Sequence, residues 1–356
     1  MSDAAVQTPR ESPKAPAGPS ASVGATPLRA VGWLVGVCVL AVVGLLSVAV
    51  GTKYIPLPVV WDALFSYDPT VYDQFLVHDG RLGRTVLAIV AGIAMAVAGA
   101  LMQALTRNPL ADPGVLGVNA GAAFCVALAV GVLGFDETNS LVWFSFLGAV
   151  IATVVVYALG SRGRGGATPV RLTLAGVAIG ALLSGLTSGV TLLDPQAFDQ
   201  MRWWSSGSLA NRDMSMTLSV IPFIAAGVIL AILITRPLNV IALGDDMAHA
   251  LGARIGRTRA VGVVAVTLLC GSATAVAGPI GFVGLMVPHI ARWIVGSDQR
   301  WILAYSLLGG PIMVMAADII GRVIVRPGEM PAGVVTAFVG APVLIIMVRR
   351  ARASGL

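Results

Sequence analysis

Charged residues are scarce in this sequence. Asp, Glu, Lys and Arg make up 11% of its 356 residues, whereas hydrophobic residues make up 57%. Soluble globular proteins carry about 25% charged residues. A soluble protein with so much apolar surface would aggregate, so the surface of this chain must face lipid. The composition therefore predicts a membrane protein and gives no reason to expect a nucleic-acid partner.

Lysine is rarer still, and the positions of the lysines exclude a P-loop ATP-binding site in this chain. The two lysines are Lys14, in the stretch SPKAP, and Lys53, in GTKY. A phosphate-binding P-loop needs the pattern G-x-x-x-x-G-K-[ST], and neither lysine offers it. The sequence also contains no H-E-x-x-H and no G-x-S-x-G segment, so an intramembrane enzyme has no support from motifs. We therefore expect a chain that is not an enzyme and has no ATPase site.

Cysteines and histidines are few and lie far apart. They are Cys38, Cys125, Cys270, His78, His249 and His289. Metal sites usually draw on clusters of these residues at short spacings, and no such spacing occurs here. We predict no metal site and no cofactor, and we interpret His289 as a structural histidine rather than a ligand.

Long apolar segments indicate how the chain crosses the membrane. A spanning helix needs about 20 largely apolar residues, and about ten segments meet this requirement. They lie near 30–50, 82–105, 114–134, 140–160, 170–193, 215–235, 260–277, 280–295, 302–325 and 331–348. We therefore predict an all-α polytopic membrane protein with its transmembrane domain in residues 28–356. Residues 1–27 are rich in Pro, Ala and Ser and are predicted to form a disordered cytoplasmic tail.

The distribution of charge predicts the orientation. Cytoplasmic connections of membrane proteins carry an excess of Lys and Arg. With an even number of spans and both termini in the cytoplasm, most arginines fall inside, including Arg162 and Arg257, whereas Asp136 and Glu137 fall outside. We expect a multi-pass protein of the cell membrane with both termini cytoplasmic.

Two features inside the predicted spans could carry function. Small residues recur at i+4 in the fifth span, at Gly176, Gly180, Ser184 and Ser188. Such a stripe lets helices pack closely, or it lines a path for a bulky solute. In the ninth span, Arg322 lies one helical turn after Asp318, and this spacing favours a structural ion pair over a proton relay.

Trp203 and Trp204 follow the fifth span, in DPQAFDQMRWWSSGS. Tryptophans are enriched where helices leave the membrane, and this position explains the pair. A stacking platform for an aromatic ligand is the alternative interpretation.

The segment 237–259, PLNVIALGDDMAHALGARIGRTR, is the most polar internal part of the chain. Asp245 and Asp246 favour a helix N-terminus, and Gly252 suits the position just after a helix. The segment therefore predicts a short amphipathic helix on the cytoplasmic side. It is either a solvated connector or a docking element for a cytoplasmic partner.

Several of these segments together resemble one family. Residues 81–118, RLGRTVLAIVAGIAMAVAGALMQALTRNPLADPGVLGV, resemble the signature of the FecCD permeases, the membrane subunits of ABC importers for ferric siderophores, haem and cobalamin. The match continues in the same order with LTLAGVAIGALLSGLTSGV, PLNVIALGDDMAHALG, VAGPIGFVGLMVPHIAR and EMPAGVVTAFVGAP. It leaves out only the N-terminal tail.

The resemblance implies the type II importer fold, with ten helices in each of two permease subunits, two cytoplasmic ATPase subunits and an external substrate-binding protein. It places the 237–259 segment in a cleft of the ATPase, with contacts from Asp245, Asp246, Ala248, Leu251, Gly252 and Arg254. It places Arg81, Arg84 and Arg322 opposite acidic residues of the binding protein. We also assign Asn108 and Pro109, together with the stripe residues Gly176, Gly180, Ser184 and Ser188, to the translocation path or gate.

We therefore expect a permease subunit that carries a bulky iron chelate inward, with a ferric siderophore as the first expectation. Haem, cobalamin and ferric citrate stay open as cargo, as do a homodimer and a heterodimer of permease subunits. A secondary transporter driven by an ion gradient is the rival class, and it should hold more acidic residues near mid-membrane.

Overall fold

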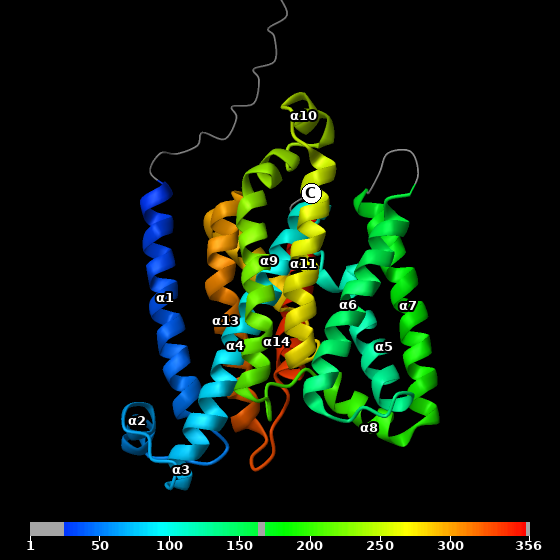
Figure 1. Cartoon of the computed structure of the whole chain (residues 1–356). Coiled ribbons are helices and arrows are strands. Elements are labelled where there is room, and N and C mark those ends of the chain that lie inside the picture. The colour runs from blue at the N-terminus through cyan, green and yellow to red at the C-terminus, as the bar shows by residue number, and fades with distance from the viewer. Residues whose placement is uncertain (1–24, 163–167, 354–356) are drawn as a thin grey trace, which may run out of the picture.

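A computed structural model describes residues 25–162 and 168–353 (Figure 1). All regular secondary structure in these two ranges is helical. The predicted tail 1–27, apart from its last three residues, lies outside the described residues. The all-α membrane fold predicted from the sequence is confirmed.

Apolar helices account for the predicted spans one by one. Seven are long and apolar enough to cross a membrane, and three more carry shorter apolar stretches. The long helices are α1 (Ala25–Ala49), α4 (Gly83–Thr106), α6 (Thr138–Gly160), α7 (Pro169–Leu193), α9 (Met214–Ile241), α11 (Ile255–Ala277) and α13 (Gln299–Ile324). The other three are α5 (Val118–Gly131), α12 (Val283–Val295) and α14 (Ala332–Ala353). Short elements connect them, namely α2 (Leu57–Phe65), α3 (Tyr72–Phe75), η1 (Leu76–Leu82), η2 (Pro113–Leu116), α8 (Pro195–Trp204) and α10 (Asp245–Ala250).

The bundle has two distinct ends. α10 lies at one end, together with the first residues of α1 and the last residues of α14, whereas α2, α3 and α8 lie at the opposite end (Figure 1). We call these the α10 end and the α8 end. Both ends of the described chain therefore lie on the same side of the bundle, as the predicted orientation requires.

α4 forms the centre of the bundle. The span that contains it has 78% of its most apolar window buried, whereas the corresponding share for α7 is 6%. Glycines let two neighbours approach the α4 backbone, because Gly99 lies against Gly284 of α12 and Gly92 lies against Gly310 of α13. A Cβ added at Gly92 would lie 2.5 Å from the backbone nitrogen of Pro311. Small residues at these positions are therefore required for the close packing of membrane helices.

The helix-breaking stretch GPIGFVGLMVPHIAR forms the junction between α11 and α12. Gly278 follows α11 with a φ of 74°, and Phe282 precedes α12 with a φ of 67°. Gly278 also lies directly against the carbonyl oxygen of Trp204, so any side chain there would collide with the end of α8. The break in the helix is thus packed within the protein, where its backbone polar groups can be satisfied.

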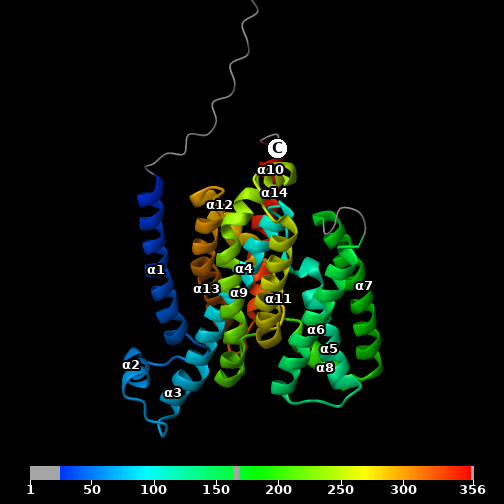
Figure 2. The ribbon, with the colours of Figure 1, turned by 45° about the horizontal axis from the view of Figure 1, so that its top comes forward.

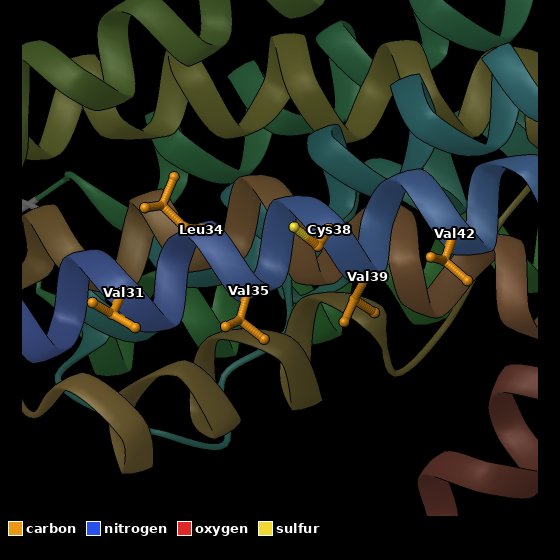
Figure 3. Close-up of a pocket in the computed structure, with 6 residues that line it drawn as sticks. All are labelled: Val31, Leu34, Val35, Cys38, Val39 and Val42. Carbon is orange, nitrogen blue, oxygen red and sulfur yellow. The ribbon is translucent and has the colours of Figure 1, made fainter.

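α1 stands at one side of the bundle and packs mainly on α13. The Tyr305 hydroxyl donates a hydrogen bond to the Arg29 carbonyl at 2.7 Å, and Trp33 Nε1 donates one to the Ala304 carbonyl at 3.2 Å. A shallow groove on α1 is lined by Val31, Leu34, Val35, Cys38, Val39 and Val42 (Figure 3). Because these side chains are apolar apart from one thiol, the groove suits lipid acyl chains better than a polar ligand.

Helices α5 to α8 form the flank on the other side of the central helices (Figure 2). α5 and α6 approach closely where Gly121 faces Gly148. α7 packs on α5 and α6 but exposes Leu174 and Leu182 on its outer face. In a membrane, such a face must contact lipid or another subunit.

Candidate functional site

Asp245, the first residue of α10, connects three helices at the α10 end. Its carboxylate accepts a hydrogen bond from Arg259 Nη2 at 3.0 Å and lies 3.1 Å from Arg107 Nη2. Arg107 immediately follows α4, and Arg259 lies near the start of α11. A carboxylate is also favourable at a helix N-terminus. Asp245 thus ties α10 to two central helices.

The surface of α10 and its flanks is apolar as well as charged. Leu243, Met247 and Leu251 are 64%, 54% and 61% exposed. Gly252 has a φ of 74° and no atom within 4 Å of an added Cβ. Four of the residues predicted to contact the ATPase are exposed, namely Asp246, Leu251, Gly252 and Arg254. This end of the molecule therefore presents a compact, protruding surface.

Ala248 differs from the other predicted contact residues. Its side chain is fully buried, in a small apolar cluster with Ile241 and Ile255. Ala248 therefore holds α10 against the ends of α9 and α11, and its side chain does not reach the surface.

Asp318 of α13 lies toward the α8 end and, like Asp245 at the α10 end, contacts two arginines. It is fully buried, with Arg84 Nη2 at 2.6 Å from Oδ1 and Arg322 Nη2 at 2.5 Å from Oδ2. Arg84 also forms an ion pair with Glu329, at 2.6 Å. The neighbours Asp318 and Arg322 are therefore in contact, and α4 supplies a second arginine. Without these partners, a buried carboxylate would be strongly destabilising.

Two of the three predicted docking arginines point into the protein. Arg322 Nη1 donates to the Ser47 carbonyl at 2.7 Å, and Arg81 Nη1 donates to the Ala49 carbonyl at 2.6 Å. The last carbonyls of a helix have no partner within the helix, so both arginines cap the C-terminal end of α1. Their exposed fractions are 2% and 8%. Arg84, with 11% of its side chain exposed, is the most accessible of the three.

The residues assigned to the translocation path lie in two places. Asn108 and Pro109 are exposed in the loop after α4 at the α10 end, directly after the Arg107 that contacts Asp245.

The i+4 stripe of α7 winds around its helix instead of forming one straight face. Gly176 is buried against the carbonyl oxygen of Val115, Gly180 is half-buried, and Ser184 and Ser188 are exposed. Each step of four residues advances by about 40° around a helix with 3.6 residues per turn. The buried end therefore packs on η2, and the exposed end is open on the outer face of α7.

A cavity of about 680 Å³ opens at the α8 end between α4, α6, α8 and α11. Its charged lining residues are Arg84, Arg212 and Glu329, and its aromatic ones are Trp203 and Trp204. Among the described residues, Arg212 Nε is buried and has no hydrogen-bond partner. Burial lowers the pKa of Arg212 below its ordinary value.

Other polar groups offer little for catalysis or metal binding. Within residues 25–162 and 168–353, no three or more His, Cys, Asp and Glu side chains gather closely enough to hold a metal ion. His289 packs edge-on against Trp293, with ring centroids 4.8 Å apart. The charged residues described above thus form ion pairs, cap α1 or line the cavity.

Four of these functional residues carried no local signal in the sequence. Arg107 and Arg259 reach Asp245 from other helices, and Glu329 reaches Arg84 across 245 positions of the chain. Arg212 lies in a loop whose path could not be predicted. The sequence shows only that a charged residue lies near the edge of an apolar span, and this does not identify its partner.

The chain matches a known family over most of its length. Residues 39–350 match the FecCD transport family. The chain is 50% identical over 337 residues to the ferric enterobactin transport system permease protein FepD of Escherichia coli (strain K12), covering 94% of this chain and 99% of that protein. It is 40% identical over 278 residues to the hemin transport system permease protein HmuU of Yersinia pestis, covering 76% and 82%.

A solved structure shares the fold. It is an inward-facing conformation of a metal-chelate type ABC transporter, with a TM-score of 0.80, 24% identity, and coverage of 90% of this chain and 99% of that chain. The ten apolar helices, the protruding α10 and the family match lead to one conclusion. This chain belongs to the FecCD transport family, whose members are permease subunits of ABC transporters, and it is a transport subunit without an ATPase site of its own.

Proposed function

We propose that this chain forms the membrane path of an importer that carries a ferric siderophore into the cytoplasm, with ATP hydrolysed on two partner subunits. The observation that carries the proposal is the exposed apolar surface of Leu243, Met247 and Leu251 at the tip of the bundle. Apolar patches of this kind are typical of surfaces that dock a partner. A connector that faced only water would have no need of it.

The contacts of α10 give a route for movement into the bundle. A partner that displaces α10 pulls on α4 and α11 through Asp245, and on α9 and α11 through the cluster around Ala248. α4 in turn touches α12 and α13 at glycine contacts. Packed interfaces of this type have discrete arrangements rather than a continuous range, so a shift of α10 would switch the bundle between two states.

The orientation follows from the same proposal. The α10 end faces the cytoplasm, and the α8 end faces the external binding protein. An acidic residue of the binding protein can reach Arg84 by replacing Glu329. Arg81 and Arg322 are buried behind this surface, where they cap the C-terminal end of α1.

A second permease subunit completes the path. The part of the α7 stripe from the half-buried Gly180 to the exposed Ser184 and Ser188 would then line a passage between the two subunits. That subunit is either a copy of this chain or a related permease.

A ferric siderophore is the cargo best supported by the relatives, because a protein 50% identical to this chain is named for ferric enterobactin transport. Haem is the second candidate, since a protein 40% identical is named for hemin transport. The rival mechanism of ion coupling finds little support. Asp318, the carboxylate predicted within a span, is engaged by two arginines.

Uptake of a radio-iron-loaded siderophore tests the proposal in a strain that lacks the gene. Uptake should return when the gene is restored and should survive collapse of the membrane potential while ATP is maintained. If restored uptake stops with the potential, the transporter is ion-coupled. If siderophore uptake never depends on the gene, the ferric siderophore is the wrong cargo, and radio-iron-labelled haem is tested next.

A further inference from the structure

The short helix α2 has an apolar side that the rest of the described chain leaves exposed. Leu57, Trp61 and Phe65 are 70%, 63% and 68% exposed. They are spaced by four residues, so they lie within about 80° of one another around the helix. The other side of α2 packs inward through Val60 and Ala63, which are both buried. α2 therefore has one side in the protein and one apolar side open to its surroundings.

The connection between α1 and α2, residues 50–56, is held by arginines. Arg81 Nη2 donates a hydrogen bond to the Lys53 carbonyl at 2.6 Å, and Arg326 Nη2 donates one to the Gly51 carbonyl at 2.8 Å. The inner side of α2 belongs to a separate buried cluster, made of Val48, Ile55, Val60, Ala63 and Val77. α2 is thus fixed to the end of α1 with its apolar side outward.

α2 lies beside a surface of the protein that faces lipid. α1 stands at the side of the bundle, and 11% of its most apolar window is buried. α2 contacts α1 and lies next to its C-terminal end, at the outer margin of the α8 end (Figures 1 and 2). Near this end of α1, Leu45 and Leu46 are exposed as well. The apolar surface of α1 therefore continues onto α2.

The exposed residues in and around α2 are typical of the boundary between membrane and water. Trp and Tyr are enriched there, because each has an apolar ring and a polar atom that can reach water. Trp61 and Phe65 pack with ring centroids 4.4 Å apart, and Tyr54 and Tyr72 are exposed nearby in the sequence. An amphipathic helix of this composition lies in the plane of the boundary, with its apolar side among the lipids.

The charges of the same region disfavour two other partners. Residues 51–80 contain four aspartates and one lysine, and Lys53 is paired with Asp73 at 2.6 Å. Like charges that face each other across an interface are unfavourable. An anionic lipid headgroup would therefore be repelled, and so would a binding protein that presents acidic residues to Arg84. A zwitterionic lipid surface carries no such cost.

We propose that α2 lies flat in the membrane–water interface at the α8 end, with Leu57, Trp61 and Phe65 inserted among zwitterionic lipids. α2 then holds the end of α1 at the membrane surface. Because Arg81 and Arg322 both bind carbonyl groups at the end of α1, the same contact sets their depth in the membrane. The contact does not depend on which cargo the transporter carries.

Photo-crosslinking tests the proposal on the complete transporter, with both permease subunits and both ATPase subunits, in nanodiscs of radiolabelled phosphatidylcholine. The photoreactive residue p-benzoylphenylalanine replaces Trp61. The same residue replaces Leu45, the lipid-facing control on α1, or Asp68, an exposed polar control in the region of α2. We expect the yield of lipid adduct at Trp61 to be severalfold above that at Asp68 and comparable to that at Leu45.

Two additions keep the result decisive. If replacement of Trp61 prevents assembly of the transporter, the photoreactive residue is placed at Phe65, on the same side of α2. Nanodiscs that also contain the anionic lipid phosphatidylglycerol should give the same yield, because the apolar side chains, and no basic cluster, make the contact.

Lipid adducts at Leu45 without adducts at Trp61 or Phe65 would overturn the proposal, as would equal yields at Trp61 and Asp68. A crosslink from Trp61 to the second permease subunit or to added binding protein would show that a protein covers α2 instead. A yield that requires phosphatidylglycerol would replace the apolar contact by a headgroup site. Each of these results leaves the proposed import intact, since radio-iron uptake tests that function separately.

Discussion

Two aspartates lie at opposite ends of α4, each between two arginines, but water reaches only one of them. Asp318 has no exposed surface, and its partners Arg84 and Arg322 are 11% and 2% exposed. The side chain of Asp245 is 37% exposed, and its partners Arg107 and Arg259 are 38% and 8% exposed. The same chemical arrangement therefore has two different environments.

The difference in environment predicts a difference in role. Breaking a buried ion pair leaves an uncompensated charge away from water, which is strongly destabilising. An exposed pair is screened by solvent and contributes little to stability. The Asp318 cluster therefore fixes α1, α4 and α13 to one another, whereas the Asp245 cluster is a joint that a partner can displace.

Replacing Asp318 should give the largest effect on stability. Asp318→Asn leaves the guanidinium groups of Arg84 and Arg322 buried without a full countercharge and should cost about 3–5 kcal/mol. Thermal unfolding of the purified protein in detergent measures the loss. Asp136→Asn, at an exposed position with no ion pair in the described chain, is the control. A melting temperature equal to that of the control would show that the cluster is not an anchor.

Replacing Asp245 should separate function from stability. Asp245→Asn should lower the free energy of unfolding by less than Asp318→Asn does, because the Asp245 side chain is 37% exposed and solvent screens its pair with Arg107, even though its other partner Arg259 is 8% exposed. Radio-iron uptake should nevertheless fall severalfold, because α10 loses its ties to α4 and α11. Uptake is measured per copy of protein in the membrane, again beside Asp136→Asn. Full uptake would mean that movement does not pass through Asp245.

Replacing Glu329 should give the smallest effect. Glu329→Gln removes one of two anionic partners of Arg84. The loss of stability should be smaller than for Asp318→Asn, because the Glu329 side chain is 32% exposed and Asp318 still neutralises Arg84. Because Arg84 is then freer to meet an acid of the external binding protein, the affinity of that protein should rise. Binding of the purified binding protein to the transporter in nanodiscs measures it. A fall in affinity would indicate that Glu329 itself contacts the binding protein.

Local patterns in the sequence predicted the spans and the position of α10. The spans depend on apolar runs, and α10 depends on an acidic first turn at Asp245 and on Gly252 just after the helix. The spacing of Asp318 and Arg322 indicated their contact, since one helical turn separates them. The partners Arg84 and Arg107 could not be found in this way, because they come from another helix. The burial of Ala248, Arg81 and Gly176 also depends on packing between helices, which has no local signal.

A pair of glycines provides the most direct test that the transporter is driven through α10. Gly252 and Gly134 have φ angles of 74° and 71°, and neither has an atom within 4 Å of an added Cβ. They lie at opposite ends of the molecule, and aspartate tolerates this backbone conformation better than most residues. Each substitution by Asp therefore introduces the same charge and a similar backbone cost.

The measurement is radio-iron siderophore uptake by Gly252→Asp and Gly134→Asp, with the amount of each protein in the membrane determined alongside. The account predicts that Gly252→Asp abolishes uptake while inserting normally, and that Gly134→Asp transports like the wild type. Wild-type uptake by Gly252→Asp would contradict it.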